Sequence, residues 1–210
     1  KLLLRSNING PEFYDYESAL NNKIYNKWDD YDYKFLEYLK KNNIDLKNKS
    51  IISISEEPGF IGEKLKKYTN NILFTALNEN TAKLMNEKIG IKTVKYDLNE
   101  DYIYNITDQK YDVIIYRSCL NFAFNFEKIL EEILLISNSS SIVILSIHTP
   151  SISSCLMWMF DDYTLLTLIN SDYLKNFFKR NNFICKKKDI TSYNPRKHYY
   201  NSTLKKIFYY

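Results

Sequence analysis

The chain has 210 residues, of which 45% are hydrophobic and 26% are charged, and its formal net charge is +4. This length suits one domain with a full core, and the ordinary globular composition argues against long disordered linkers. The positive charge is too small and too evenly spread for a dedicated nucleic-acid binder. The three cysteines form no Cys-x-x-Cys, which argues against a zinc site or a disulfide framework and fits a reducing, cytoplasmic location.

The segment before residue 48 is predicted to be helical. Apolar and aromatic side chains recur there at helical spacing, namely Trp28, Tyr31, Phe35, Leu36 and Leu39. One or two helices are therefore expected within residues 12–44, and they should end at the polar stretch 40–43.

From residue 51 onward, short apolar runs alternate with amphipathic stretches. This alternation predicts an α/β fold with a Rossmann-like, doubly wound and mostly parallel sheet that has helices on both faces. Two final strand-like runs are expected to pair as an antiparallel hairpin at the edge of the sheet. The expected strands are Ile51–Ser55, Ile72–Leu77, Thr93–Tyr96, Tyr111–Tyr116, Ser141–Ile147, Phe183–Ile190 and Thr203–Tyr210, and the expected helices are Ile61–Tyr68, Thr81–Ile89 capped by Asn80, Phe126–Ser137 and Tyr173–Asn181.

The sequence contains no internal repeat and no domain boundary, so residues 1–210 are expected to form a single domain. The most apolar window, residues 142–160, is interrupted by His148, Pro150 and several serines. A membrane span is therefore not expected.

The predicted sheet also indicates where a ligand would bind. In an open α/β sheet, ligands bind beyond the carboxyl ends of the strands, near the point where the strand order reverses. The residues at these ends are 55–59 for the first strand, Asn78 and Glu79 for the second, Asp97 and Leu98 for the third, Arg117 and Ser118 for the fourth, and His148 and Thr149 for the fifth.

The first of these strand ends has the pattern of a nucleotide-binding loop. The stretch IISISEEPGFIG, residues 51–62, reads as a strand, a Pro-Gly turn and the start of a helix, and ILFTALNEN, VKYDLNE, YDVIIYRSCLNFAFNFEKILEEILLI and SSSIVILSIHTPS follow it. Over residues 25–192, this order resembles the class I S-adenosylmethionine-dependent methyltransferases that modify small molecules and sugars. The resemblance implies S-adenosylmethionine as the cofactor. It also implies a small molecule as the methyl acceptor, such as a sugar or another surface-polymer precursor.

The resemblance further implies which residues hold the cofactor. Asp97 corresponds to the family's acid near the adenine amino group, and Asn78 stands where the family has an acid that grips the ribose hydroxyls. The implied cofactor-binding residues are Ser53, Ser55, Glu57, Gly59, Asn78, Glu79, Asp97, Leu98 and Arg117.

Several positions depart from the family pattern and leave a second interpretation open. Ser53 stands in place of an Asp, and Ser55 and Glu57 stand in place of glycines that let the backbone approach the cofactor closely. The alternative is a catalytically inactive methyltransferase-like domain that serves as a scaffold or binding partner. A nicotinamide-dependent oxidoreductase is disfavoured, because SEEPGFIG lacks the Gly-x-Gly-x-x-Gly pattern.

His148 is the candidate catalytic base, because it follows the fifth strand and histidine titrates near neutral pH. A partly buried histidine bonded to backbone is the alternative. Residues 148–170 are expected to cap the substrate pocket. Their apolar stretch Met157–Phe160 could line that pocket, belong to the core, or contact a second copy of the chain, so a homodimer stays an open alternative.

Overall fold

The structure, a computed structural model, describes residues 25–55, 60–117, 119–149, 169, 171–184, 187–192 and 204–209. The strands within them are β1 (Ile51–Ser55), β2 (Ile72–Ala76), β3 (Lys92–Lys95), β4 (Tyr111–Arg117), β5 (Ser137–Thr149), β6 (Lys187–Ser192) and β7 (Leu204–Tyr209). The α-helices are α2 (Tyr25–Lys41), α3 (Phe60–Leu65), α4 (Glu79–Ile89), α5 (Phe126–Leu135) and α7 (Ser171–Arg180), and Ile103–Asn105 and Leu120–Phe122 are short 3₁₀ turns.

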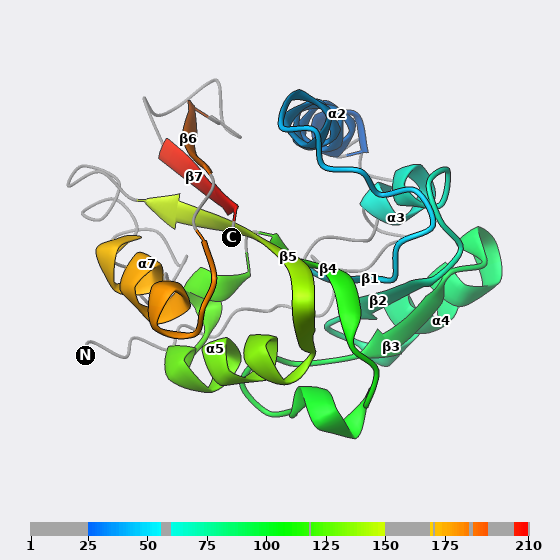
Figure 1. Ribbon diagram of the computed structural model, residues 1–210. Coiled ribbons are helices and arrows are strands. Elements are labelled where there is room, and N and C mark those ends of the chain that lie inside the picture. The colour runs from blue at the N-terminus through cyan, green and yellow to red at the C-terminus, as the bar shows by residue number, and fades with distance from the viewer. Residues whose placement is uncertain are drawn as a thin grey trace, which may run out of the picture.

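All seven strands belong to one sheet in the order β3-β2-β1-β4-β5-β7-β6. The strands β1 to β5 pair in parallel, and β7 runs antiparallel to both β5 and β6. Figure 1 shows α2, α3 and α4 on one face of the sheet and α5 and α7 on the other. The predicted doubly wound, mostly parallel sheet with an antiparallel hairpin at its edge is therefore confirmed.

The alternation of side chains along the strands divides the core into two layers. On the α2 face, Ile51, Val113 and Ile144 pack with side chains of α2, α3 and α4. On the α5 face, Ile52 and Ile114 pack with side chains of α5 and α7. Strand side chains point alternately to the two faces, and helices cover both faces. Nearly every residue of β1 and β4 is therefore buried.

Gly62 allows α3 to lie close to the sheet. A Cβ added at this position would stand 3.1 Å from the Ile91 Cδ1 atom and 3.7 Å from the Phe74 ring. Since buried side chains have little room to move, a larger residue here would push α3 away from the start of β3.

A local network joins β1 and β4 at the amino end of the sheet. The backbone N–H and the hydroxyl of Ser50 each donate to Asp112 Oδ2 at 2.9 Å. The backbone bond from Ser50 is the main cause that lowers the pKa of the Asp112 carboxyl below its ordinary value. This network aligns the two central strands from their first residues.

The prediction that Asn80 caps the helix after β2 is wrong, because Asn78 is the cap. Asn78 has extended backbone angles, φ −127° and ψ 156°, and its Oδ1 accepts a hydrogen bond from the Thr81 N–H at 2.8 Å. β2 ends at Ala76, one residue before the predicted end. The helix therefore starts at Glu79 and places Asn80 in its first turn.

The start of β5 also differs from the prediction. A helix to residue 137 and a strand from residue 141 were expected, but α5 ends at Leu135 and β5 begins at Ser137. The reason is an irregularity in the pairing with β4, where Tyr111 pairs with Ser137 but Val113 pairs with Ile142.

Parts of the chain cannot be compared with the predictions. The helix expected within residues 12–44 is confirmed over α2, and residues 1–24 lie outside the described residues, as do residues 150–168 of the expected substrate cap. In the described part of the chain, no helix is long and apolar enough to cross a membrane. The cytoplasmic location, the single domain and the homodimer stay predictions.

Candidate functional site

The strand order reverses between β1 and β4. From β1 the chain builds outward to β2 and β3, and it then returns to the other side of β1 to form β4 and β5. In a doubly wound sheet this switch point, at the carboxyl ends of the strands, is where a ligand binds. The residues at this edge therefore form the candidate site.

A layer of buried polar side chains lies at this edge, on the α2 face of the sheet. Ser55 pairs in register with Arg117, and Arg117 pairs with Ser146 of β5. All three are buried. Residues in register on parallel strands point to the same face, so these side chains lie side by side beneath α2.

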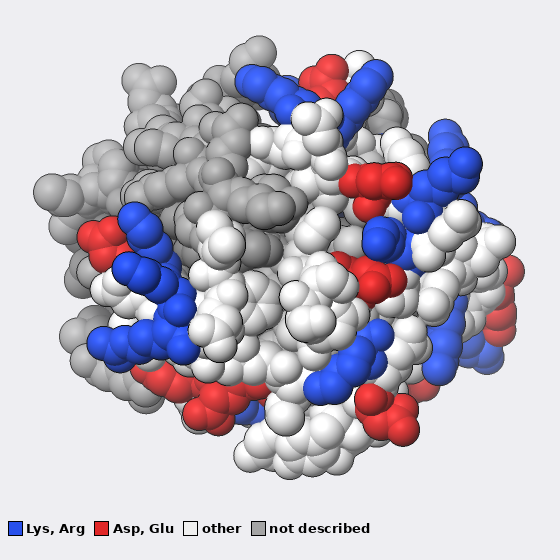
Figure 2. All heavy atoms as spheres, in the orientation of Figure 1, with Lys and Arg blue, Asp and Glu red and all other residues white. Residues whose placement is uncertain are grey.

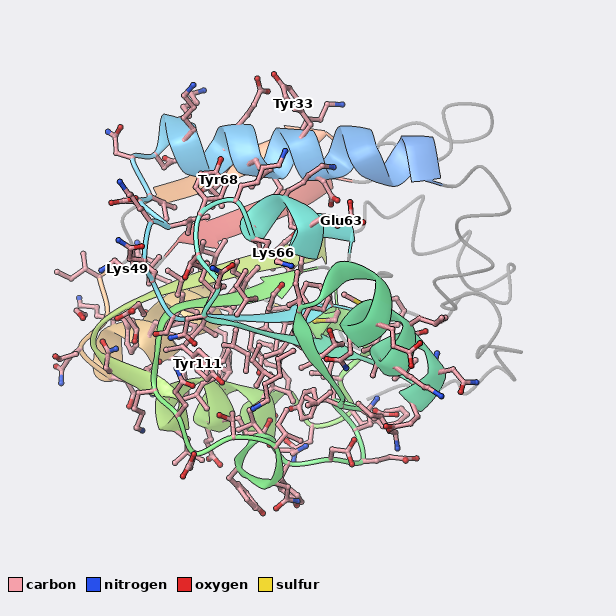
Figure 3. All side chains as sticks on the ribbon, turned by 90° about the vertical axis from the view of Figure 1, so that its right-hand side faces the viewer. Tyr33, Lys49, Glu63, Lys66, Tyr68 and Tyr111 are labelled. Atoms are coloured by element: carbon pink, nitrogen blue, oxygen red, sulfur yellow. The ribbon has the colours of Figure 1, made fainter. Side chains whose placement is uncertain are left out.

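Asp32 of α2 completes this layer. Its Oδ1 accepts a hydrogen bond from Arg117 Nη1, and its Oδ2 lies 3.5 Å from Lys64 Nζ. The Asp32 side chain is fully buried and that of Arg117 is 1% exposed, so each charge compensates the burial of the other. Figure 3 shows α2 lying across the top of the view with α3 beneath it, and the exposed Tyr33 pointing away from the protein.

The next strand ends carry the residues expected to hold adenosine. The Tyr96 N–H donates to Ala76 O at 2.9 Å, which brings the chain after β2 and the chain after β3 together. Asn78 follows Ala76 by two residues, Asp97 comes directly after Tyr96, and both side chains are half-buried. The two side chains therefore lie at neighbouring strand ends, as expected for groups that share one ligand.

Three polar atoms at this edge retain hydrogen-bonding capacity within the part of the chain that the structure describes. The Asn78 amide uses Oδ1 for its cap, which leaves Nδ2 as a donor, and Asp97 uses Oδ1 to accept from the Asn99 N–H, which leaves Oδ2 as an acceptor. The hydroxyl of Ser53, two residues before the end of β1, is buried and has no hydrogen bond to any described residue. An acceptor and a donor at neighbouring strand ends fit the exocyclic amine and the ribose hydroxyls of an adenosine group.

Other predicted site residues have structural roles. The Leu98 side chain lies in the core on the α5 face, and its carbonyl accepts from Lys128 Nζ at 3.1 Å. Glu79 is exposed in the first turn of α4, where an acid stabilises the positive end of the helix dipole. A cofactor contact through either residue stays a prediction.

Some predicted residues cannot be placed in full. Glu57 and Gly59 lie outside the described residues. His148 is described only as a backbone position in β5, where it pairs with Lys205 of β7. Its proposed role as a base stays a prediction.

The sequence analysis missed the carboxylates that organise this edge from within helices. Asp32 shares the buried stripe of α2 with Phe35 and Leu39, at spacings of three and seven residues, and Glu132 shares the buried stripe of α5 with Ile129 and Ile133. An acid within an apolar helical stripe was the available signal, because such an acid needs a partner inside the fold.

The fold is similar to that of solved methyltransferases. Magnesium protoporphyrin IX methyltransferase (ChlM) from Synechocystis, solved with bound S-adenosylhomocysteine, is 11% identical with a TM-score of 0.64 over 87% of this chain and 82% of that one. An S-adenosylmethionine-dependent methyltransferase from Mesorhizobium loti is 9% identical with a TM-score of 0.61 over 79% and 92%. TehB from Haemophilus influenzae is 13% identical with a TM-score of 0.60 over 83% and 59%.

No family model and no curated protein sequence matches the chain. The strand order, the antiparallel β7 and these similar structures lead to one conclusion about architecture. The chain has the fold of the class I S-adenosylmethionine-dependent methyltransferases.

Proposed function

We propose that this protein is an S-adenosylmethionine-dependent methyltransferase that acts on a small molecule. The proposal is supported by this fold together with two atoms at neighbouring strand ends, Asn78 Nδ2 and Asp97 Oδ2, that bond to no other described residue. Asp97 Oδ2 would accept from the adenine amino group, and Asn78 Nδ2 would donate to a ribose hydroxyl. Ser53, Ser55, Glu57 and Gly59 would contact the remainder of the cofactor.

Methyl transfer requires few catalytic side chains from the protein itself. When bound, S-adenosylmethionine supplies a methyl group already activated on a sulfonium. The protein has to hold the acceptor in line and, for an oxygen acceptor, to take up a proton. We assign that proton to His148, which lies next to the last residue of β5.

The distribution of charge supports a small acceptor over a nucleic acid. Figure 2 shows acidic and basic side chains lying next to one another on the face of the molecule that it displays. A nucleic-acid surface would instead gather basic residues of one sign. The narrower assignment of the acceptor to sugars or surface-polymer precursors rests on the family resemblance of the sequence.

One observation favours a second function, that of a non-catalytic scaffold. Asn78 stands where the family has an acid, and in this chain its side-chain oxygen serves the α4 cap. A neutral amide binds a hydroxyl less strongly than a carboxylate does. The same fold could then serve as a binding partner without a cofactor.

Calorimetric titration with S-adenosylmethionine and S-adenosylhomocysteine separates the two functions. The enzyme should bind both with micromolar affinity. Asp97→Asn should lower the affinity for S-adenosylhomocysteine about tenfold to a hundredfold, because a charge-assisted hydrogen bond is lost. This substitution keeps an oxygen that can accept from the Asn99 N–H, so the loop should stay folded.

The exposed Asp108 provides the matched control, and Asp108→Asn should bind like the unaltered protein. No heat at millimolar cofactor, from protein that melts cooperatively, would contradict the methyltransferase and support the scaffold.

A further inference from the structure

We propose that Glu132, which lies in the core on α5, is a positioning residue for the adenosine side of the candidate site; this inference rests on the proposed function. Its side chain is 3% exposed. Glu132 Oε2 accepts from the Tyr96 hydroxyl at 2.6 Å, and Glu132 Oε1 accepts from the Ile103 N–H at 3.1 Å. One carboxylate therefore holds both ends of the segment 96–103, which follows β3.

Lys128 extends this attachment to the middle of the segment. Its Nζ lies 3.5 Å from Glu132 Oε1, one helical turn away, and donates to the carbonyls of Leu98, at 3.1 Å, and Asp101. It also lies 4.5 Å from the centre of the Tyr102 ring. Together, Glu132 and Lys128 form hydrogen bonds to three backbone groups of segment 96–103 and to the hydroxyl of Tyr96.

The segment carries Asp97, whose orientation depends on the shape of the loop. The Asp97 N–H donates to Asp101 Oδ2 at 2.7 Å, and Asp97 Oδ1 accepts from the Asn99 N–H at 2.8 Å. Asn99 then reaches the chain after β4, because its Nδ2 donates to Phe122 O and its Oδ1 accepts from the Phe124 N–H at 2.7 Å. Fixing segment 96–103 therefore fixes Asp97 and the neighbouring loop together.

This arrangement is costly for a purely structural contact. A buried carboxylate must be desolvated, and an apolar side chain at the same place often stabilises a fold equally well. The buried side chains of Tyr96, Leu98 and Ile103 already attach this segment to the core. What the carboxylate adds is a fixed position for the Tyr96 hydroxyl and the Ile103 N–H at the two ends of the segment. Groups held in place before binding avoid the entropic cost of ordering them in the complex.

The test compares Glu132→Gln with Glu131→Gln, since Glu131 is exposed on the same helix and serves as a matched control. Hydrogen exchange, measured residue by residue without any ligand, reports the Ile103 amide directly. We expect its protection to fall at least about tenfold in Glu132→Gln and to stay unchanged in Glu131→Gln, because the amide loses a charge-assisted bond.

The second readout is the affinity ratio of S-adenosylhomocysteine to S-inosylhomocysteine, in which an oxygen replaces the adenine amino group. Partial unfolding lowers both affinities equally and leaves the ratio unchanged. We expect Glu132→Gln to reduce the ratio about tenfold, since Asp97 would no longer be held toward the amine. Should Glu132→Gln fail to fold, Tyr96→Phe removes one bond of the same network, with the exposed Tyr104→Phe as its control.

Each outcome decides a different point. Unchanged Ile103 exchange in Glu132→Gln would overturn the proposal, and so would faster exchange with an unchanged ratio, because Glu132 would then be structural only. If the unaltered protein binds neither nucleoside, the proposed function is wrong and the ligand part of this inference falls with it. The exchange data would still decide whether Glu132 fixes the loop.

Discussion

At the scale of single residues, the buried ion pair of Asp32 and Arg117 joins positions 85 residues apart in the chain. The Arg117 guanidinium also lies 5.7 Å from the centre of the Phe35 ring. Taking two charges out of water is unfavourable, and the pair persists because its hydrogen bond offsets that cost. The pair thereby holds α2 over the switch point between β1 and β4.

Removing one member of this pair should be strongly destabilising. We expect Asp32→Ala to lower the free energy of unfolding by about 3–5 kcal/mol, because the guanidinium stays buried after its carboxylate is lost. Urea denaturation measures the effect, and Glu37→Ala, an exposed change on the same helix, should cost less than about 0.5 kcal/mol.

A compensating change provides the control for this explanation. The double variant Asp32→Ala with Arg117→Met should recover part of the loss, since it buries no uncompensated charge. If the double variant is less stable than Asp32→Ala alone, the electrostatic explanation of the pair is wrong.

At the scale of elements, the start of α4 shows how one side chain serves both the fold and the candidate site. The Asn78 Oδ1 atom satisfies the Thr81 N–H, which the helix itself cannot pair. The Nδ2 atom of the same amide remains directed to a ligand in our proposal. A carboxylate at this position would also cap the helix, so the choice of an amide is not explained by capping.

Substitution of the two neighbouring asparagines tests the position of the cap. Asn78→Ala should destabilise the protein by about 1 kcal/mol, because the first turn of α4 loses its side-chain acceptor. Asn80→Ala should be neutral or slightly stabilising, since Asn80 is exposed within the first turn and alanine is a better helix former. Thermal unfolding of the two variants in parallel would contradict this assignment if Asn80→Ala proved the more harmful.

At the scale of the whole molecule, the sequence was sufficient to predict the sheet. Every one of its seven strands was expected within a few residues, because buried parallel strands require continuous apolar runs and β1 matches its predicted bounds in full. The antiparallel pairing of β6 and β7 was also expected, and the structure confirms it. These features follow from local hydrophobic patterns.

Apart from the local cap at Asn78, the features that escaped prediction depend on contacts between distant segments. The pairing irregularity at β5 is set by Tyr111 and Ser137, which meet only once β4 and β5 are side by side. In the same way, the apolar pattern of α5 shows that Glu132 faces the core, but it does not show that Tyr96 is its partner. The candidate site was therefore predictable as a set of strand ends, and the interactions that hold those ends were not.

A backbone amide NMR titration of the isotopically labelled protein with S-adenosylhomocysteine would locate an adenosyl-binding site directly. We expect the shift changes to gather at the carboxyl edge, on Ser55, Asn78 and Asp97. The amides of Ser50 and Asp112, at the amino end of the same strands, should stay in place. No change at millimolar ligand, or changes centred on the amino end, would contradict an adenosyl-binding site in this fold.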